Sequence, residues 1–364
     1  MIDAPKLRLT LDVAPLLEDQ WTGIPVFTRR LAQALQQSGQ VDLSFAVRLT
    51  RIPATRLWDT VRAGFGTFLR TDFEHGLIEG LDRLDPSIPL LYPSVKSACG
   101  ICGSEASVIH DVSTLVMPET HAEANVRFHL DPLREQLATD EAVFCASEAT
   151  RAALVSAFPS AAARARVLYQ YADWPEEFAL DDRNLPRVAL GRYAAVIGTI
   201  EPRKNLGLLL RALSHPAVRD SDLRFVVIGK KGWNLDAALA GLDPAQHKRI
   251  LFTDFVSEFA KYRLLRAAEF LVFPSIYEGF GIPAVEAMHL GKPVLAAFTS
   301  SFPEVIGDAG VYFDPLSVDE FGAAFEEISN PARIAELAPK AVEQARQFNA
   351  ERMAAPVLEW LKGR

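Results

Sequence analysis

Short apolar segments rich in Val, Ile and Phe recur along the whole chain, with helix-like stretches between them. Parallel strands are buried on both faces and are therefore apolar throughout. Each parallel pair also needs a long crossover connection, which is usually a helix. The alternation of the two patterns therefore predicts an α/β protein built from parallel sheets.

The apolar segments form two series. In the first series we expect strands at residues 7–13, 43–49, 90–94, 107–112, 142–147 and 166–172, with helices at 25–37, 119–138 and 148–158. In the second series we expect strands at residues 193–200, 223–229, 250–256, 270–275, 293–297 and 310–315. Asn205 precedes leucines at helical spacing, so we interpret it as the N-cap of the first crossover helix of the second series.

The polar, proline-containing run at 181–187 separates the two series and is interpreted as a linker. The 364 residues suffice for two domains. We expect a first domain at 1–184, a second at 185–345, and a C-terminal helix at 346–364 that packs back on the first domain. Two doubly wound sheets in tandem leave a cleft that the carboxyl ends of both sets of strands face.

Composition excludes several classes of protein. The net charge of −8 argues against a nucleic-acid partner, because duplex binders carry a positive face. No apolar run is long enough to span a bilayer, and the first residues do not resemble a signal peptide, so we expect a cytoplasmic protein. Cys99 and Cys102 form a single CxxC motif. We favour the interpretation that they are two small loop or core residues over that of a redox or zinc site.

The segment 270–305 is the most informative. A buried strand ends near Ser275, a loop contains Glu278, and Pro283 suits the first turn of a helix. Such a turn presents free backbone N–H groups and a positive helix end, which bind phosphate. Glu278 and Glu286 flank this turn, and each carboxylate accepts two hydroxyl hydrogen bonds. A nucleotide sugar combines these hydroxyls with a diphosphate. In the alternative interpretation, Glu278 is a solvated loop residue and Glu286 only interacts favourably with the helix dipole.

Arg203 and Lys204 lie between the end of a predicted strand and the start of the next helix. On the carboxyl edge of a sheet, two cations can neutralise a departing diphosphate. Alternatively they are ordinary surface charges. Because this segment and the loop of Glu278 follow strands of one sheet, we expect both to open onto the same crevice.

The second half resembles the retaining GT-B glycosyltransferases of the GT4 family, the glycogen-synthase and mannosyltransferase-like group. The matching motifs are GTIEPRKNL, IGKKGW, FPSIYEGFGIPAVEAM with two glutamates eight positions apart, GKPVLAA and SSFPEVIGDAGVYFDP. The first half matches more weakly, through TGIPVFTRRLAQAL, VIHD and CASEATRAAL. The resemblance implies a GT-B fold with two Rossmann-like domains, and transfer of a sugar from a nucleotide-sugar donor.

The resemblance also implies roles for single residues. It implies that Glu286 holds the ribose hydroxyls and that Glu278 holds hydroxyls of the transferred sugar. Arg203 and Lys204 are implied to bind the diphosphate. The remaining residues implied to contact the donor are Gly23, Thr199, Gly279, Phe280, Gly281, Ile282 and Ser301.

His110 is implied to reach the sugar from the first domain, although a core or loop histidine is an equal alternative. Two positions depart from the family pattern. Thr199 stands where members commonly have Arg, and the first loop, residues 21–25, has the single glycine Gly23.

The resemblance implies a mechanism in which the leaving diphosphate takes the acceptor proton, so that no protein nucleophile, cofactor or metal is expected. One DxD motif, Asp220 to Asp222, precedes a predicted strand and is interpreted as a solvated turn at the edge opposite the site. GDP-mannose is the favoured donor and a glycan or lipid-linked saccharide the expected acceptor, with transfer serving polysaccharide biosynthesis.

Residues 51–70 contain four arginines with apolar residues near helical spacing. Such a helix can rest on an anionic membrane, although an ordinary surface helix is the favoured alternative. A nicotinamide dehydrogenase is disfavoured because no G-x-G-x-x-G follows a strand. A GT-B-type sugar-nucleotide epimerase and a non-catalytic sugar-nucleotide-binding scaffold remain as alternative functions.

Overall fold

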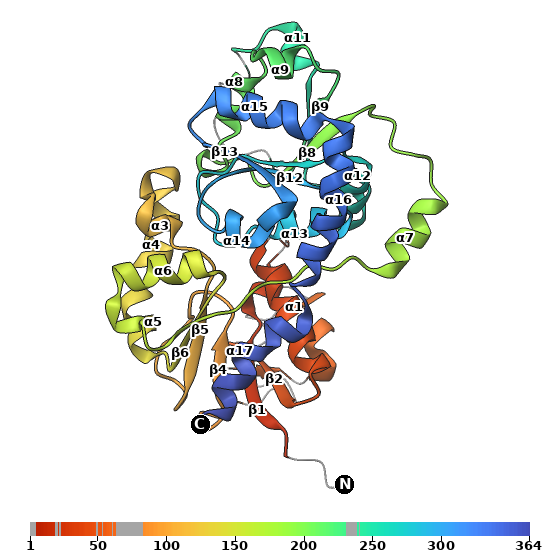
Figure 1. Cartoon of the computed structure of the whole chain (residues 1–364). Helices are drawn as coiled ribbons and strands as arrows, with labels where there is room; N and C mark the ends of the chain where they lie inside the picture. The colour runs from red at the N-terminus through yellow and green to blue at the C-terminus, as the bar shows by residue number, and fades with distance from the viewer. Residues whose placement is uncertain are drawn as a thin grey trace. The chain divides into compact units, whose positions relative to one another are not determined.

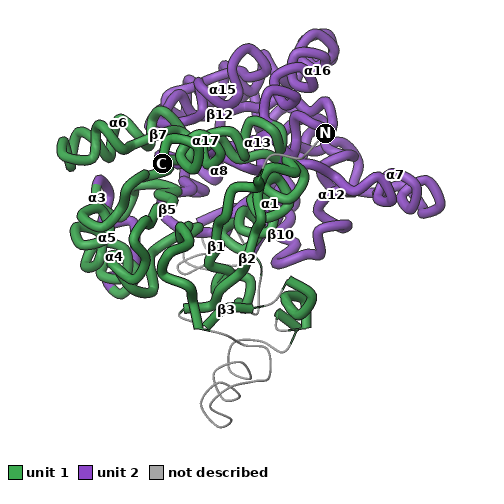
Figure 2. Tube along the Cα trace, turned by 90° about the horizontal axis from the view of Figure 1, so that it is seen from below, with its two compact units in different colours: residues 1–115, 124–171, 349–364 green, residues 116–123, 172–348 purple. Residues whose placement is uncertain are grey.

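The computed structural model describes residues 5–18, 21, 23–48, 50–52, 54–59, 61–62, 83–230, 239 and 241–364. The chain forms two compact units, shown in separate colours in Figure 2. Unit 1 consists of residues 1–115, 124–171 and 349–364, and unit 2 of residues 116–123 and 172–348. The domain boundaries expected from the sequence stay predictions.

Unit 1 is built on a seven-stranded sheet in the order β3-β2-β1-β4-β5-β6-β7. All neighbouring strands are parallel except β2 and β3. Its strands are β1 (Leu7–Asp12), β2 (Val41–Val47), β3 (Thr50–Ile52), β4 (Leu90–Tyr92), β5 (Glu105–Ile109), β6 (Ala142–Cys145) and β7 (Ala165–Val167). Its α-helices include α1 (Gly23–Gln37), α4 (Glu123–Leu130), α5 (Leu133–Thr139), α6 (Glu148–Ala157) and α17 (Ala350–Lys362).

Short elements connect these strands and helices. The four-residue helix α3 (Ser113–Val116) lies at the end of the first segment of unit 1. In the described part of the chain, 3-10 turns also occur at Ala14–Leu17, Ala54–Arg56, Pro118–Thr120, Pro159–Ala161 and Pro202–Lys204. The C-terminal helix α17 packs against α1 and β1, and its buried face includes Met353, Val357 and Trp360.

Unit 2 is built on a six-stranded parallel sheet in the order β10-β9-β8-β11-β12-β13. Its strands are β8 (Tyr193–Ile197), β9 (Arg224–Ile228), β10 (Ile250–Asp254), β11 (Leu271–Phe273), β12 (Val294–Ala297) and β13 (Gly310–Phe313). Its helices include α7 (Glu176–Arg183), α8 (Leu206–Ala212), α9 (Pro216–Arg219), α11 (Pro244–His247), α12 (Glu258–Ala267), α13 (Ile282–His289), α14 (Phe302–Ile306), α15 (Val318–Ser329) and α16 (Pro331–Arg346), with a 3-10 turn at Gly307–Ala309.

Helices cover the sheet of unit 2. In Figure 1, α8 and α15 lie on one side of this sheet, and α13 and α14 lie on the other. The aromatic rings of Phe225, Phe270, Phe321 and Phe325 form the core beneath α15, with centroids 5.8 to 6.2 Å apart. Strands β11 and β12 are buried along their whole length, as expected for parallel strands with two covered faces.

The predicted α/β class with two Rossmann-like domains is confirmed, and the structure corrects three details. The helix expected at 119–138 is divided into α4 and α5, because Pro132 has no N–H to continue the first helix. Of the strand expected at 166–172, only the first two residues belong to a strand, β7, which lies at the edge of its sheet. The linker expected at 181–187 is helical as far as Arg183, the last residue of α7.

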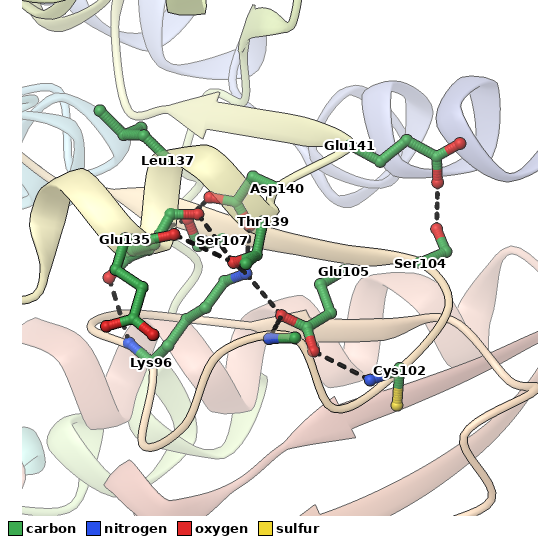
Figure 3. A network of polar contacts seen from close by, with 12 residues as sticks. Lys96, Cys102, Ser104, Glu105, Ser107, Glu135, Leu137, Thr139, Asp140 and Glu141 are labelled. Atoms are coloured by element: carbon green, nitrogen blue, oxygen red, sulfur yellow. Dashed lines mark hydrogen bonds and ion pairs between the residues drawn. The ribbon is translucent and has the colours of Figure 1, made fainter.

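A buried ion network fixes the edge of unit 1 where β5 and β6 begin (Figure 3). The ammonium of Lys96 lies 2.7 Å from Glu105 and 2.7 Å from Asp140, and all three side chains are fully buried. Backbone N–H groups of Gly100 and Cys102 also donate to the Glu105 carboxylate. The network therefore ties the loop that follows β4 to the start of β5.

The CxxC motif lies in this loop. Cys102 is buried, and burial raises the pKa of its thiol to about 11. A thiol that stays protonated at neutral pH is a poor nucleophile and a poor metal ligand. The structure thus favours the interpretation of Cys102 as a packed core residue.

Two expectations depend on residues outside the described ranges. The helix expected at 51–70 does not start there, because residues 51 and 52 belong to β3 and Ala54–Arg56 forms a 3-10 turn. Half of this segment, including residues 63–70, lies outside the described ranges, as do the last three residues of the IGKKGW motif. Across the described part of the chain, none of the helices is both long enough and apolar enough to cross a bilayer.

Candidate active site

The order of the strands places the candidate site in unit 2. Adjacent strands β8 and β11 are parallel, and the chain leaves them in opposite directions along the sheet, toward β9 and toward β12. This is a topological switch point, where α/β proteins bind ligands beyond the carboxyl ends of the strands. The segment of Arg203 and Lys204 follows β8, and the loop of Glu278 follows β11.

Both cations contact one carboxylate. The Lys204 Nζ lies 2.5 Å from Oε1 of Glu278, and an Arg203 guanidinium nitrogen lies 3.1 Å from Oε2. Arg203 also donates to the carbonyl of Tyr277 and pairs with Glu201 at 2.7 Å. The structure therefore brings together three of the residues that the sequence predicts for donor binding. It adds Glu201, which the sequence analysis missed although it lies inside the motif GTIEPRKNL.

Glu278 is held as an anion. Burial by itself raises the pKa of this carboxyl, but the charges of Lys204 and Arg203 outweigh burial and hold the pKa below its usual value. Glu278 therefore accepts hydrogen bonds at neutral pH and can receive those of sugar hydroxyls. Lys204 uses one of its three N–H donors on Glu278, so that the others can serve a phosphate.

Hydrogen bonds across the carboxyl edge fix the loop of Glu278. The Ser300 hydroxyl accepts from the backbone N–H of Glu278 at 2.9 Å. The fully buried Ser301 hydroxyl lies 2.9 Å from the carbonyl of Glu278 and 3.0 Å from that of Phe280. The Phe280 ring is buried against Phe348, with centroids 5.2 Å apart. Ser301, which the resemblance implies to contact the donor, thus braces the loop of Glu278 in this structure.

Gly281 forms the entry to α13. Its φ of +100° lies in the left-handed region, and a Cβ there would approach the Phe302 ring to 3.2 Å. Only glycine therefore makes this turn without strain. The turn places Gly279, Phe280 and Ile282 around the N-terminus of α13, the end that carries positive partial charge.

Asn205 precedes α8 as predicted but does not cap it. Its φ is +54°, and its side-chain amide donates instead to the carbonyls of Pro274 at 3.1 Å and Pro315 at 2.9 Å. Asn205 thereby joins the loop after β8 to the loops after β11 and β13. This role was not predictable, because it depends on residues 69 and 110 positions away.

Glu286 lies in the second turn of α13, with a side chain that is 2% exposed. Its Oε1 forms an ion pair with Lys261 of α12 at 2.8 Å. Neither Lys261 nor α12 was singled out by the sequence analysis. Thr199 is exposed just beyond the end of β8.

His110 and Gly23 belong to unit 1. His110 follows β5 as predicted, and its Nε2 lies 2.7 Å from the carbonyl of Pro93, so that this nitrogen carries the proton. Its Nδ1 lies 3.4 Å from the amide of Gln170, and burial lowers the pKa of the ring. Gly23 is the exposed first residue of α1, and a Cβ added there would meet none of the described atoms within 4 Å.

The predicted DxD motif lies before β9, at the edge opposite the site. Asp222 pairs with Arg192 at 2.9 Å, and Asp220 with Arg219 at 2.7 Å. Within the described ranges, no group of three or more His, Cys, Asp and Glu side chains is arranged to hold a metal ion.

Comparison with known proteins identifies the family. Residues 182–348 match the model of the glycosyl transferases group 1. O-antigen chain mannosyltransferase B of Escherichia coli is 32% identical over 255 residues, which cover 67% of this chain and 66% of that protein. The serotype-specific mannosyltransferase WbdA of Escherichia coli is 29% identical over 286 residues, which cover 74% of this chain and 33% of that protein.

A solved structure shows the same fold. The HepE protein of Anabaena in complex with UDP-glucose superposes with a TM-score of 0.67 at 16% identity, covering 98% of this chain and 100% of that one. The chain belongs to the group 1 family of glycosyl transferases, and the expected GT-B fold is confirmed. It spans about two thirds of the length of mannosyltransferase B and one third of that of WbdA.

Proposed function

We propose that this protein is a retaining glycosyltransferase that transfers mannose from GDP-mannose to a glycan or lipid-linked saccharide during polysaccharide biosynthesis. The observation that carries the proposal is the convergence of Arg203 and Lys204 on Glu278 at a topological switch point. Two fixed cations suit a diphosphate, and the adjacent carboxylate suits sugar hydroxyls. The two Escherichia coli relatives carry mannosyltransferase in their names, which favours mannose as the sugar.

In this proposal, unit 2 holds the donor. Glu286 accepts from the ribose hydroxyls, Arg203 and Lys204 hold the diphosphate with the N-terminus of α13, and Glu278 fixes the sugar. The bond from the anomeric carbon to the diphosphate oxygen breaks, and a bond to the acceptor oxygen forms on the same face. The acceptor proton passes to the leaving diphosphate. The protein supplies fixed positive charge and orientation, and no metal or protein nucleophile takes part.

Substrates and stereochemistry are tested separately. A thermal-shift panel of nucleotide sugars identifies the donor, because a ligand at 100 times its dissociation constant adds about 2.7 kcal/mol of stability. NMR of the product formed with a mannose-terminated oligosaccharide then reports the anomeric configuration. Retention of configuration supports the proposal, and inversion contradicts it. Formation of an epimerised nucleotide sugar would identify the protein as an epimerase. Binding of the nucleotide sugar without transfer or hydrolysis would identify it as a scaffold.

Membrane association through residues 51–70 is a separate part of the proposal. Sedimentation of the purified protein with vesicles that contain anionic phosphatidylglycerol at low salt, and less sedimentation at high salt, would support membrane contact. Equal recovery of the protein in the supernatant with and without vesicles would show that residues 51–70 are an ordinary surface segment.

A further inference from the structure

Lys261 is the charged partner of the Glu286 carboxylate. The Nζ of Lys261, in the second turn of α12, lies 2.8 Å from Oε1 of Glu286. The Glu286 side chain is 2% exposed and that of Lys261 is 22% exposed, so the contact is largely shielded from water. A shielded carboxylate stays charged at low cost only when an opposite charge or several hydrogen bonds compensate it.

Trp174 contacts both members of this pair. Its indole N–H donates to the backbone carbonyl of Glu286 at 3.0 Å, and the Lys261 ammonium lies 5.3 Å from the centroid of its ring. The first contact fixes the backbone of α13 at Glu286. The second is a cation–π interaction, which holds the ammonium on the side of Oε1.

An aromatic cluster holds Trp174 in turn. Its ring lies 5.3 Å from that of Tyr262 on α12, and Phe178 of α7 packs against Phe259 and Tyr262 at 5.1 and 5.7 Å. Asp182, also on α7, pairs with two arginines of α12, Arg263 and Arg266, at 2.6 Å each. The helix that carries Lys261 is thus clamped on the side that faces α7.

The pair leaves acceptor capacity on Glu286. A carboxylate has about four lone-pair directions, and Lys261 occupies one of them on Oε1. A ribose presents two neighbouring hydroxyls, and accepting both requires that the carboxylate is charged and keeps one orientation. An ion pair to one oxygen meets both requirements without blocking the other oxygen.

We infer that Lys261 is a positioning residue that fixes the Glu286 carboxylate to accept hydrogen bonds from the two ribose hydroxyls of a nucleoside diphosphate, with Trp174 fixing the pair. This inference rests on the proposed function, because it deepens the role of Glu286 in donor binding. It assigns Lys261 no contact with the reacting atoms.

The test compares a nucleoside diphosphate with its analogue that lacks both ribose hydroxyls. Calorimetry measures the affinity of the full-length protein for GDP, UDP and their 2′,3′-dideoxy analogues in the wild type and in Lys261→Met. Loss of a charged hydrogen-bonding partner typically lowers affinity roughly tenfold or more. We expect such a loss for the ribonucleotide that binds, and less than about a threefold change for its dideoxy analogue.

Control variants separate positioning from folding. Lys261→Arg keeps the charge and should restore most of the affinity. Lys340→Met removes the lysine of an exposed pair with Glu336 in the same unit and should leave affinity unchanged. Thermal unfolding of all variants reports whether Lys261→Met is folded. If Lys261→Met does not fold, Lys261→Gln replaces it and is judged by the same comparison.

The outcomes are distinguishable. An equal loss for the ribonucleotide and the dideoxy analogue, or no loss for either, overturns the inference while the proposed function stands. If the wild type binds neither GDP nor UDP, the proposed function fails and the inference fails with it. A loss confined to the ribonucleotide, reversed by arginine, supports the inference.

Discussion

The ammonium of Lys204 and the carboxylate of Glu278 form an ion pair 2.5 Å long, although 74 positions separate them in the sequence. The pair exists because β8 and β11 are adjacent parallel strands whose following loops meet at the same edge. The backbone N–H of Ile276 donates a hydrogen bond to the carbonyl of Arg203, which joins the two loops directly. Charge for a phosphate and an acceptor for hydroxyls therefore lie side by side.

Removing the Lys204 charge should impair turnover more than stability. We expect Lys204→Met to lower turnover by about 10² to 10³, the usual effect of losing one preorganised electrostatic contact. Arg203 remains within 3.1 Å of Glu278, so that the buried carboxylate keeps one cation and the fold persists. Initial rates with saturating donor measure the effect, with Lys340→Met as the matched control. Near-normal turnover in Lys204→Met would contradict the role of this residue.

The network of Lys96, Glu105 and Asp140 should contribute to stability alone. Lys96→Met leaves two buried carboxyl groups without their cation, and breaking a buried pair in this way typically costs about 3–5 kcal/mol. The combined variant with Glu105→Gln and Asp140→Asn should recover part of the loss. Urea unfolding measures both variants. A change below about 0.5 kcal/mol for Lys96→Met would show that the network carries no stability.

Asp12 should make stability depend on pH. It is buried at the end of β1, and burial raises its pKa from 3.8 to about 7, against the opposing N–H of Ala14 and the charge of Arg48. The folded protein therefore binds this proton more tightly than the unfolded chain does. Its stabilising contribution is complete at acid pH and is lost as pH rises through about 7. In Asp12→Asn, the midpoint of unfolding should depend less on pH between about pH 4 and pH 7 than it does in the wild type. An unchanged slope would contradict this.

Chelation should leave transfer unaffected. The acidic DxD motif is paired with arginines away from the carboxyl edge of the unit 2 sheet, and the candidate site already contains two cations. We expect equal rates before and after dialysis against EDTA. Activity abolished by EDTA and restored by manganese would show instead that a divalent ion stabilises the leaving diphosphate.

The fold and the motif residues of the candidate site could be predicted from the sequence. Apolar runs locate the strands of unit 2, because parallel strands are buried on both faces, and the glycine at 281 marks a turn that has positive φ. The prediction that the loops after β8 and β11 share an edge followed from the rule for parallel strands. The contacts of Arg203 and Lys204 with Glu278 agree with it.

The residues that the sequence analysis missed act through tertiary contacts. Lys261 meets Glu286 across 25 positions and Trp174 meets it across 112, and neither spacing leaves a periodic signal. Asn205 fits an N-cap by its local pattern, but the left-handed backbone and two distant carbonyls redirect its side chain. Local propensity cannot anticipate such partners.

The role of the two carboxylates in donor binding is tested most directly by calorimetry that compares a nucleotide sugar with its nucleoside diphosphate. Binding of GDP-mannose and GDP is measured in the wild type, Glu278→Gln and Glu286→Gln. We expect Glu278→Gln to weaken the binding of GDP-mannose but not of GDP, because Glu278 contacts the sugar. Glu286→Gln should weaken the binding of both ligands, because Glu286 contacts the ribose. Equal affinities of all three proteins for both ligands, or no binding by the wild type, would contradict the central claim that these two carboxylates hold one donor.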